Sequence, residues 1–283
     1  MAWLTTDRPD VFRAEAGAFL DTRPDLHHVL LSGLDVADYA RESGDAASLP
    51  VLGWWRDDSE GTTAAFVRTP PSTVATTSLP GSACASLARL LASETPSPGG
   101  LVADEATVPA FVDQWQALTG REPEVRPHSR LFRLDTLVQP PLLPTGRARV
   151  ASATERTLVL DWCEQFVKEA GPLGMSVPAF VDERLAHGGW TVWDVDGEAV
   201  AMATRTRTVS GMTRVTCVYA PAEYRGQGYA TAVTAASASA AREAGAAHVV
   251  LCADPADLKA HRLYQALGFQ PAADYRIISL RHP

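Results

Sequence analysis

The sequence predicts a mixed α/β fold in two domains, and three local patterns support this prediction. Asp196-Gly197 separates two apolar runs, which is a strong signal for a β-hairpin. A glycine-containing loop at residues 225–228 follows another apolar run and opens a long alanine-rich segment, which predicts a strand, a loop and a helix. Three prolines and a glycine within residues 139–146 predict a linker. We therefore expect domains at residues 1–140 and 141–283.

The expected elements on either side of this break alternate between strands and helices. Apolar residues recur between 158 and 167, which predicts a helix beginning at about residue 153. Gly245 and Gly268 each follow a helical segment and are placed to end it. The whole set, in order, is a strand at 129–134, an extended segment at 149–152, the helix from 153, strands at 190–194, 199–204 and 212–219, a helix at about 228–244, a strand at 248–252, a helix at about 258–267 and a strand at 275–280.

The first half of the chain looks like a degraded copy of the second. Residues 53–61 repeat the pattern of 189–197, with Gly-Trp, an acidic turn and a closing glycine, and residues 115–120 repeat that of 264–268. The glycine loop at 225–231 has no counterpart in the first half. We expect an internal duplication with a degenerate first copy. The alternative is a chance similarity between short alanine-rich segments.

Composition and charge narrow the class of protein. The 283 residues suffice for two domains, and a hydrophobic fraction of 46% suits a globular core. The net charge of −8 argues against a nucleic-acid partner, since nucleic-acid binders usually carry a basic stripe. No signal peptide is evident at the start, and no apolar stretch approaches membrane-spanning length. We therefore expect a soluble cytoplasmic protein with no membrane partner.

The four cysteines, Cys84, Cys163, Cys217 and Cys252, are scattered and form no Cys-x-x-Cys pair. The spacing of zinc ligands is absent, so no metal site is expected. We expect reduced, mostly buried thiols. Cys217 lies on an expected strand near the glycine loop, so covalent catalysis through it stays an alternative, although apolar neighbours raise the pKa of a thiol.

The loop at residues 225–228 is suited to hold a phosphate. Where a strand runs through a loop into a helix, several backbone N–H groups point to one place, and the helix dipole favours negative charge there. The loop lacks Lys-Ser/Thr after its second glycine, which excludes a nucleoside triphosphatase loop. Backbone groups alone would hold a diphosphate, which suits a cofactor that is bound rather than cleaved at its phosphates. A dinucleotide-binding oxidoreductase is a remote alternative, because Thr231 replaces the third glycine of that fingerprint.

Two motifs follow one another in the second half: Arg-x-x-Gly-x-Ala at residues 225–230 and Leu-Tyr-x-x-Leu-Gly-Phe at residues 263–269. Together they resemble the GNAT superfamily of acyl-CoA-dependent N-acetyltransferases, over roughly residues 146–283. The resemblance implies two GNAT-like domains, each a mixed, mostly antiparallel sheet flanked by helices. The N-terminal domain would be degenerate, and the C-terminal domain would be catalytic.

The resemblance implies that acetyl-CoA donates an acetyl group to a primary amine by direct attack within a ternary complex. The acceptor would be a small molecule or a protein amino group, and formation of a homo-oligomer stays open. The residues expected to contact coenzyme A are Val218, Tyr219, Ala220, Arg225, Gly226, Gln227, Gly228, Tyr229, Ala230, Thr231 and Asp257. Asp257 stands where many members have asparagine, and a carboxylate tolerates nearby phosphates poorly. This replacement keeps open an alternative function as a non-catalytic acyl-CoA-binding or sensing module.

Tyr264 is the residue that the resemblance places near the thioester sulfur. A phenol has a reference pKa of about 10, close enough to that of a thiol to donate a proton to a departing thiolate. The alternative is an aromatic side chain that only packs. Arg225 would contact a phosphate or lock the loop through neighbouring carbonyls. Spacing selects no general base among Asp194, Glu198 and Asp254.

Overall fold

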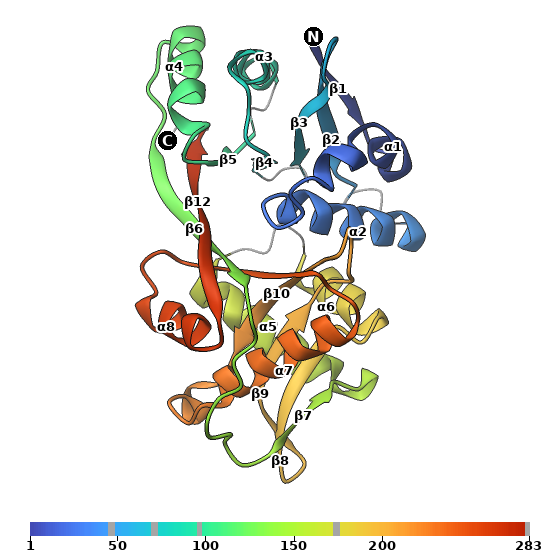
Figure 1. Cartoon of the computed structure of the whole chain (residues 1–283), viewed down its shortest axis with the longest axis vertical. Coiled ribbons are helices and arrows are strands. Elements are labelled where there is room, and N and C mark those ends of the chain that lie inside the picture. Colours follow the sequence, from blue (N-terminus) through green and yellow to red (C-terminus); the bar gives the residue numbers. More distant parts are fainter. Residues whose placement is uncertain (45–48, 69–72, 95–97, 172–175, 281–283) are drawn as a thin grey trace. The chain divides into compact units, whose positions relative to one another are not determined.

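The computed structural model describes the chain in five stretches. They are residues 1–44, 49–68, 73–94, 98–171 and 176–280 (Figure 1). None of the helices in these stretches is long and apolar enough to cross a lipid bilayer. The chain packs into two compact units: the first is Met1–Arg130 with Ala273–Pro283, and the second is Leu131–Ala272.

The same element order occurs twice along the chain. The first copy comprises β1 (Ala2–Thr6), α1 (Pro9–Leu20), α2 (His28–Ser43), β2 (Val51–Asp57), β3 (Gly61–Arg68), β4 (Val74–Thr76), α3 (Gly81–Ala92), β5 (Gly100–Asp104), α4 (Val108–Thr119) and β6 (Val125–Leu134). The second comprises β7 (Arg147–Val150), α5 (Arg156–Ala170), α6 (Val177–Ala186), β8 (Trp190–Val195), β9 (Glu198–Arg205), β10 (Met212–Tyr219), α7 (Tyr229–Glu243), β11 (His248–Ala253), α8 (Leu258–Ala266) and β12 (Phe269–Ser279). This repetition supports an internal duplication.

The two copies exchange their last strands. In the first unit the strand order is β1-β2-β3-β4-β5-β12, with β5 and β12 antiparallel from Gly100↔Ser279 to Asp104↔Tyr275. In the second unit the order is β6-β11-β10-β9-β8-β7. The units therefore differ from the boundary expected near residue 140, which separates the two copies along the chain but falls inside the second unit.

The proline-rich segment at 139–146 is a loop within the second unit rather than a linker between the units. Trp193 Nε1 donates a hydrogen bond to the carbonyl of Thr145 (2.9 Å). Just before the segment, the amide of Val138 donates to the carbonyl of Leu267 (3.0 Å). These bonds tie the loop to the hairpin and to the end of α8.

The second unit is a mixed, mostly antiparallel sheet between two helical layers. The pairs β7/β8, β8/β9 and β9/β10 are antiparallel, whereas β10/β11 is parallel. On one face, Val159 of α5 and Phe180 of α6 pack with Trp190 and other strand residues. On the other face, α7 packs against β8, β9 and β10 around Trp193, and Tyr264 of α8 packs near Phe132 of β6 and Phe269 of β12. This arrangement confirms the fold class expected from the sequence.

The hairpin expected at Asp196-Gly197 is confirmed. Asp196 has φ = 53° and Gly197 has φ = 92°, so both central residues are left-handed, as the preferred two-residue hairpin turn requires. Asp194 Oδ1 accepts a hydrogen bond from the amide of Gly197 (3.0 Å). The turn brings the start of β9, at Glu198, beside the end of β8.

An arginine ties the start of α5 to the edge of the sheet. Arg149 Nε donates to Asp194 (2.8 Å), and its two terminal nitrogens donate to the two oxygens of Glu155 (2.7 Å each). Glu155 also accepts from the amide of Ser152 in a capping box. The hydrogen bonds from Arg149 lower the pKa of Glu155 to about 2.

The first prediction concerns this network at acid pH. Because the pKa of Glu155 is depressed from 4.5, its stabilising effect is complete above pH 4.5 and is lost as the pH falls towards 2. Glu155→Gln should lower the free energy of unfolding by about 2 kcal/mol at pH 7, and the deficit should shrink below pH 4.5. Urea unfolding at several pH values measures this, with exposed Glu164→Gln as the control. A deficit that stays constant down to pH 3 would contradict the prediction.

The second prediction concerns Gly268, which has φ = 92°. A Cβ on Gly268 would overlap the carbonyl oxygen of Thr136, so both backbone strain and a clash oppose a side chain there. Gly268→Ala should destabilise the protein by about 2–4 kcal/mol. Gly245→Ala is the matched control, because φ is 88° and the space is open, and it should cost only about 1 kcal/mol. If urea unfolding gave the same loss of stability for both variants, the clash at Gly268 would be relieved without a cost in free energy, which would contradict the prediction.

Candidate active site

The two glycines of the loop that joins β10 to α7 leave part of its backbone open. Gly226 has φ = 79° and Gly228 has φ = 86°, and a Cβ on either glycine would meet no atom within 4 Å. Gly228 is the N-cap of α7, and no side chain caps the first turn. The amides of Tyr229, Ala230 and Thr231 therefore lie at an open, electropositive helix end.

Arg225 is used to hold this loop in shape. Its Nε donates to the carbonyl of Ala220 (2.9 Å), and its Nη2 donates to both oxygens of Glu169 on α5 (2.7 and 3.0 Å). Its guanidinium also lies over the ring of Tyr219, 5.5 Å from the ring centroid. Of the two roles expected for Arg225, these contacts support the locking role. Gln227 adds a second tie, through Nε2 to the carbonyl of Glu223 (3.0 Å).

The end of β10 separates from β11. Their parallel register runs from Met212↔His248 to Val215↔Leu251, and no further pair follows in the described strands. Cys217 has φ = 46°, and the register of β10 with β9 shifts between Thr216 and Tyr219. Val218 lies within this bulge and Tyr219 and Ala220 follow it, and among the described residues no pairing with β11 continues past Val215.

Tyr264 lies on α8 in the core of the second unit. Its ring packs near Phe132 and Phe269, with centroids 5.9 and 6.2 Å away, and only 8% of its surface is exposed. Burial, and after it the charges of Asp257 and Cys252, raise the pKa of the Tyr264 phenol. The hydroxyl therefore stays protonated at neutral pH and can donate a proton but not accept one as a phenolate.

Asp257 has a structural task that the sequence did not reveal. Its Oδ1 accepts hydrogen bonds from the amides of Lys259 (3.1 Å) and Ala260 (3.0 Å), so it is the N-cap of α8. Aspartate is among the best residues at this position. The carboxylate thus has a reason to be present that requires no contact with a cofactor.

Three other residues considered for catalysis, Asp194, Asp254 and Cys217, make contacts within the protein. Asp194 pairs with Arg149, and Asp254 Oδ1 accepts from the amide of Ala256 (2.7 Å). Cys217 is fully buried with its Sγ 3.9 Å from that of Cys163, and burial raises its pKa well above the ordinary value. Cys217 is therefore a neutral thiol rather than a ready nucleophile.

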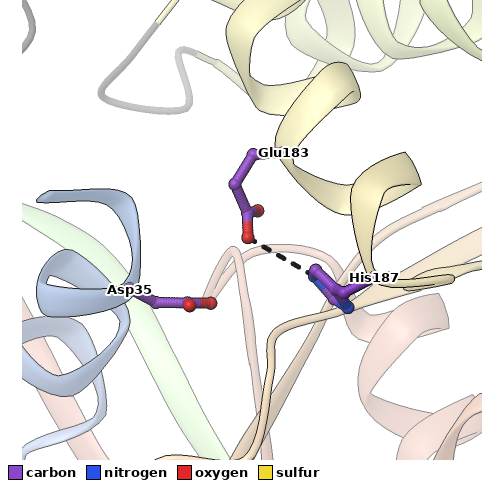
Figure 2. A group of neighbouring side chains, drawn as sticks. All are labelled: Asp35, Glu183 and His187. Atoms are coloured by element: carbon purple, nitrogen blue, oxygen red, sulfur yellow. Dashed lines mark ion pairs between the residues drawn. The ribbon is translucent and has the colours of Figure 1, made fainter. Parts of the chain in front are cut away.

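Sequence reasoning missed a buried charged group on α6. Glu183 is completely buried and pairs with Arg184, with Arg207 (2.8 Å) and with His187 (3.4 Å). Figure 2 shows Glu183, on the last turn of α6, and His187, the C-cap of that helix, pointing toward each other. Since two arginines pair with Glu183, this carboxylate is neutralised within the second unit.

Sequence reasoning also missed a cavity of about 640 Å³ in the second unit. It lies between α5, the β8–β9 turn and the segment that joins β10 to α7. Its lining includes Tyr219, whose backbone follows the bulge, and Tyr224, which precedes the glycine loop. The lining residues come from segments far apart in sequence, which is why no local pattern indicates the cavity.

The chain is similar to known acetyltransferases in sequence motif and in fold. Residues 156–269 match the family model described as Acetyltransferase (GNAT) family. A comparison with curated proteins gives no match. Among solved structures, a GNAT-family acetyltransferase from Colwellia psychrerythraea superposes with a TM-score of 0.60 and 10% identity, over 99% of this chain and 100% of the other.

Two further structures give the same result. A Drosophila protein superposes with a TM-score of 0.69 and 11% identity, over 98% of each chain. A GCN5-related N-acetyltransferase from Sphaerobacter thermophilus superposes with a TM-score of 0.59 and 14% identity, over 98% of this chain and 94% of the other. The fold is therefore shared along nearly the whole chain, and residues 156–269 carry the match to the GNAT acetyltransferase family model.

Proposed function

We propose that this protein is an acetyl-CoA-dependent N-acetyltransferase that moves an acetyl group to a primary amine by direct attack in a ternary complex. The observation that carries the proposal is the uncapped start of α7, preceded by two left-handed glycines, within a GNAT domain. A helix end with free amides favours a bound anion. With an acyl-CoA as donor, we expect the reaction to take place in the cytoplasm.

The residues present fit coenzyme A. The open space around Gly226 and Gly228 lets a diphosphate approach the amides at the start of α7 without meeting a side chain. The unpaired edge of β10 past the bulge offers N–H and C=O groups to the amides of a pantetheine arm, in the manner of an added strand. Arg225 holds these two parts in a fixed relation, because it bonds to Ala220 and to α5.

When bound, acetyl-CoA would supply an activated acyl thioester. The chain's own residues then have three tasks: the loop amides hold the diphosphate, the end of β10 directs the pantetheine arm, and Tyr264 donates a proton to the departing sulfur. The proton that the attacking nitrogen loses would pass through water and restore the neutral phenol. Burial raises the pKa of the phenol, and the same surroundings raise the proton affinity of a thiolate beside it. Direct attack requires no protein nucleophile, in agreement with the neutral thiol of Cys217.

The third prediction tests the role of Tyr264. Tyr264→Phe keeps the packing against Phe132 and Phe269 but removes the proton donor. We expect turnover of acetyl-CoA with an accepted amine to fall about 10²- to 10⁴-fold, with nearly unchanged affinity for coenzyme A. Thiol release and calorimetry measure the two quantities, with Tyr39→Phe in the first unit as the control. Wild-type turnover in the variant would assign Tyr264 to packing. Coenzyme A binding without thiol release for any amine, in the unaltered protein, would favour a binding or sensing module.

The fourth prediction tests the diphosphate site by comparing substitutions of the glycines at the two ends of α7. Gly228→Ala puts a side chain in the left-handed region where the diphosphate should lie, and we expect at least about 10-fold weaker binding of coenzyme A. Gly245→Ala imposes the same strain at the other end of α7 and should leave the affinity unchanged. Calorimetric titration distinguishes them. Equal affinities in the two variants would place the diphosphate elsewhere.

A further inference from the structure

The cavity of the second unit has aromatic walls. Trp162 of α5 and Tyr219 of β10 line it, with ring centroids 6.3 Å apart and planes inclined by 53°. Tyr224 lines it from the segment before the glycine loop. Trp162 and Tyr224 are only partly buried, so their ring surfaces are accessible to a ligand. Aromatic faces attract cations as well as apolar groups. Arg225 already lies over the ring of Tyr219, so the rings of Trp162 and Tyr224 are the ones offered to a further cation.

The same cavity is lined by acidic groups. Glu155, Glu198 and Glu223 contribute to its lining, and no lysine, arginine or histidine is present among the described residues that line it. Arg149 neutralises Glu155. Glu198 accepts a hydrogen bond from the Tyr224 hydroxyl (2.5 Å), a neutral donor that orients the carboxylate and leaves its charge intact. The cavity therefore disfavours anions and offers a positioned carboxylate beside an aromatic ring.

The position of the cavity connects it with the proposed acetyl-CoA site. Tyr219 forms part of the cavity wall with its side chain, while its backbone belongs to the unpaired end of β10. Glu223 and Tyr224 line the cavity just before Arg225 and the two left-handed glycines. A molecule in the cavity would thus lie against the segment that we expect to direct the pantetheine arm.

We propose that this cavity binds a small organic ammonium ion, with the cationic group held between the aromatic rings and the Glu198 carboxylate and an apolar body filling the remainder. The inference rests on the proposed function, since it names the class of acceptor for the amine transfer. A volume of about 640 Å³ suits a small molecule. The acceptor is therefore a small cationic amine whose apolar part packs against Leu158, Ala199 and Pro221.

Binding of a cation that cannot be acetylated tests this inference without any need for turnover. The probe is phenethyltrimethylammonium, titrated calorimetrically into the full-length protein without coenzyme A, with 2-phenylethanol as the neutral comparison. We expect the cation to bind at least about 10-fold more tightly than the alcohol. Equal affinities, or no binding of the cation, would overturn the proposal.

Two variants locate the binding. Glu198→Gln keeps an oxygen for the Tyr224 hydroxyl but removes the charge, and Trp162→Leu removes one aromatic wall. Each should weaken binding of the cation at least about 5-fold, whereas Glu164→Gln on the exposed side of α5 should not. Thermal melting checks that both variants fold. If Trp162→Leu does not fold, the test rests on Glu198→Gln. Unchanged affinity in Glu198→Gln would show that the cation binds elsewhere.

Thiol release from acetyl-CoA with phenethylamine separates this inference from the proposed function. Selective binding of the cation at Glu198 without thiol release for any amine would leave the ammonium site standing and overturn the transferase. Thiol release whose KM for the amine is unchanged in Glu198→Gln and Trp162→Leu would support the transferase and overturn the ammonium site.

Discussion

The left-handed conformation of Cys217 is the constraint on which the site of the second unit depends. A non-glycine residue with φ = 46° inside a strand breaks the regular ladder and turns the following residues. Among the described residues the parallel pairing with β11 ends at Val215, and Val218 and Tyr219 have no register partner on β11. Close packing of Cys217 against Cys163 in the core holds the residue in this strained state.

Charged side chains preserve the geometry that the bulge creates. Arg225 bonds to the carbonyl at the end of β10 and to Glu169 on α5, so the loop, the strand and the helix move together. Arg149 does the same for the start of α5, the end of β8 and the turn beside Glu198. Both arginines use their several donors to join three segments, which lysine could not do with equal directionality.

The two copies of the element order are joined through the exchange of their last strands. Each copy supplies the strand that completes the other unit's sheet, with β12 beside β5 and β6 beside β11. A sheet edge needs a partner for its free N–H and C=O groups, but backbone pairing does not specify which copy supplies the strand. The first copy therefore takes part in the packing of the second unit through β6.

Local sequence alone determined several of the secondary-structure elements and turns of this protein. Asp196-Gly197 specified the hairpin turn, and the glycine loop with its alanine-rich continuation specified the start of α7, because these features need only neighbouring residues. Tertiary structure decided the exchange of β6 and β12, the task of Arg225, the burial of Glu183 and the cavity beside Trp162. Each of these depends on groups brought together from segments distant along the chain, and periodicity and turn propensity carry no information about such pairings.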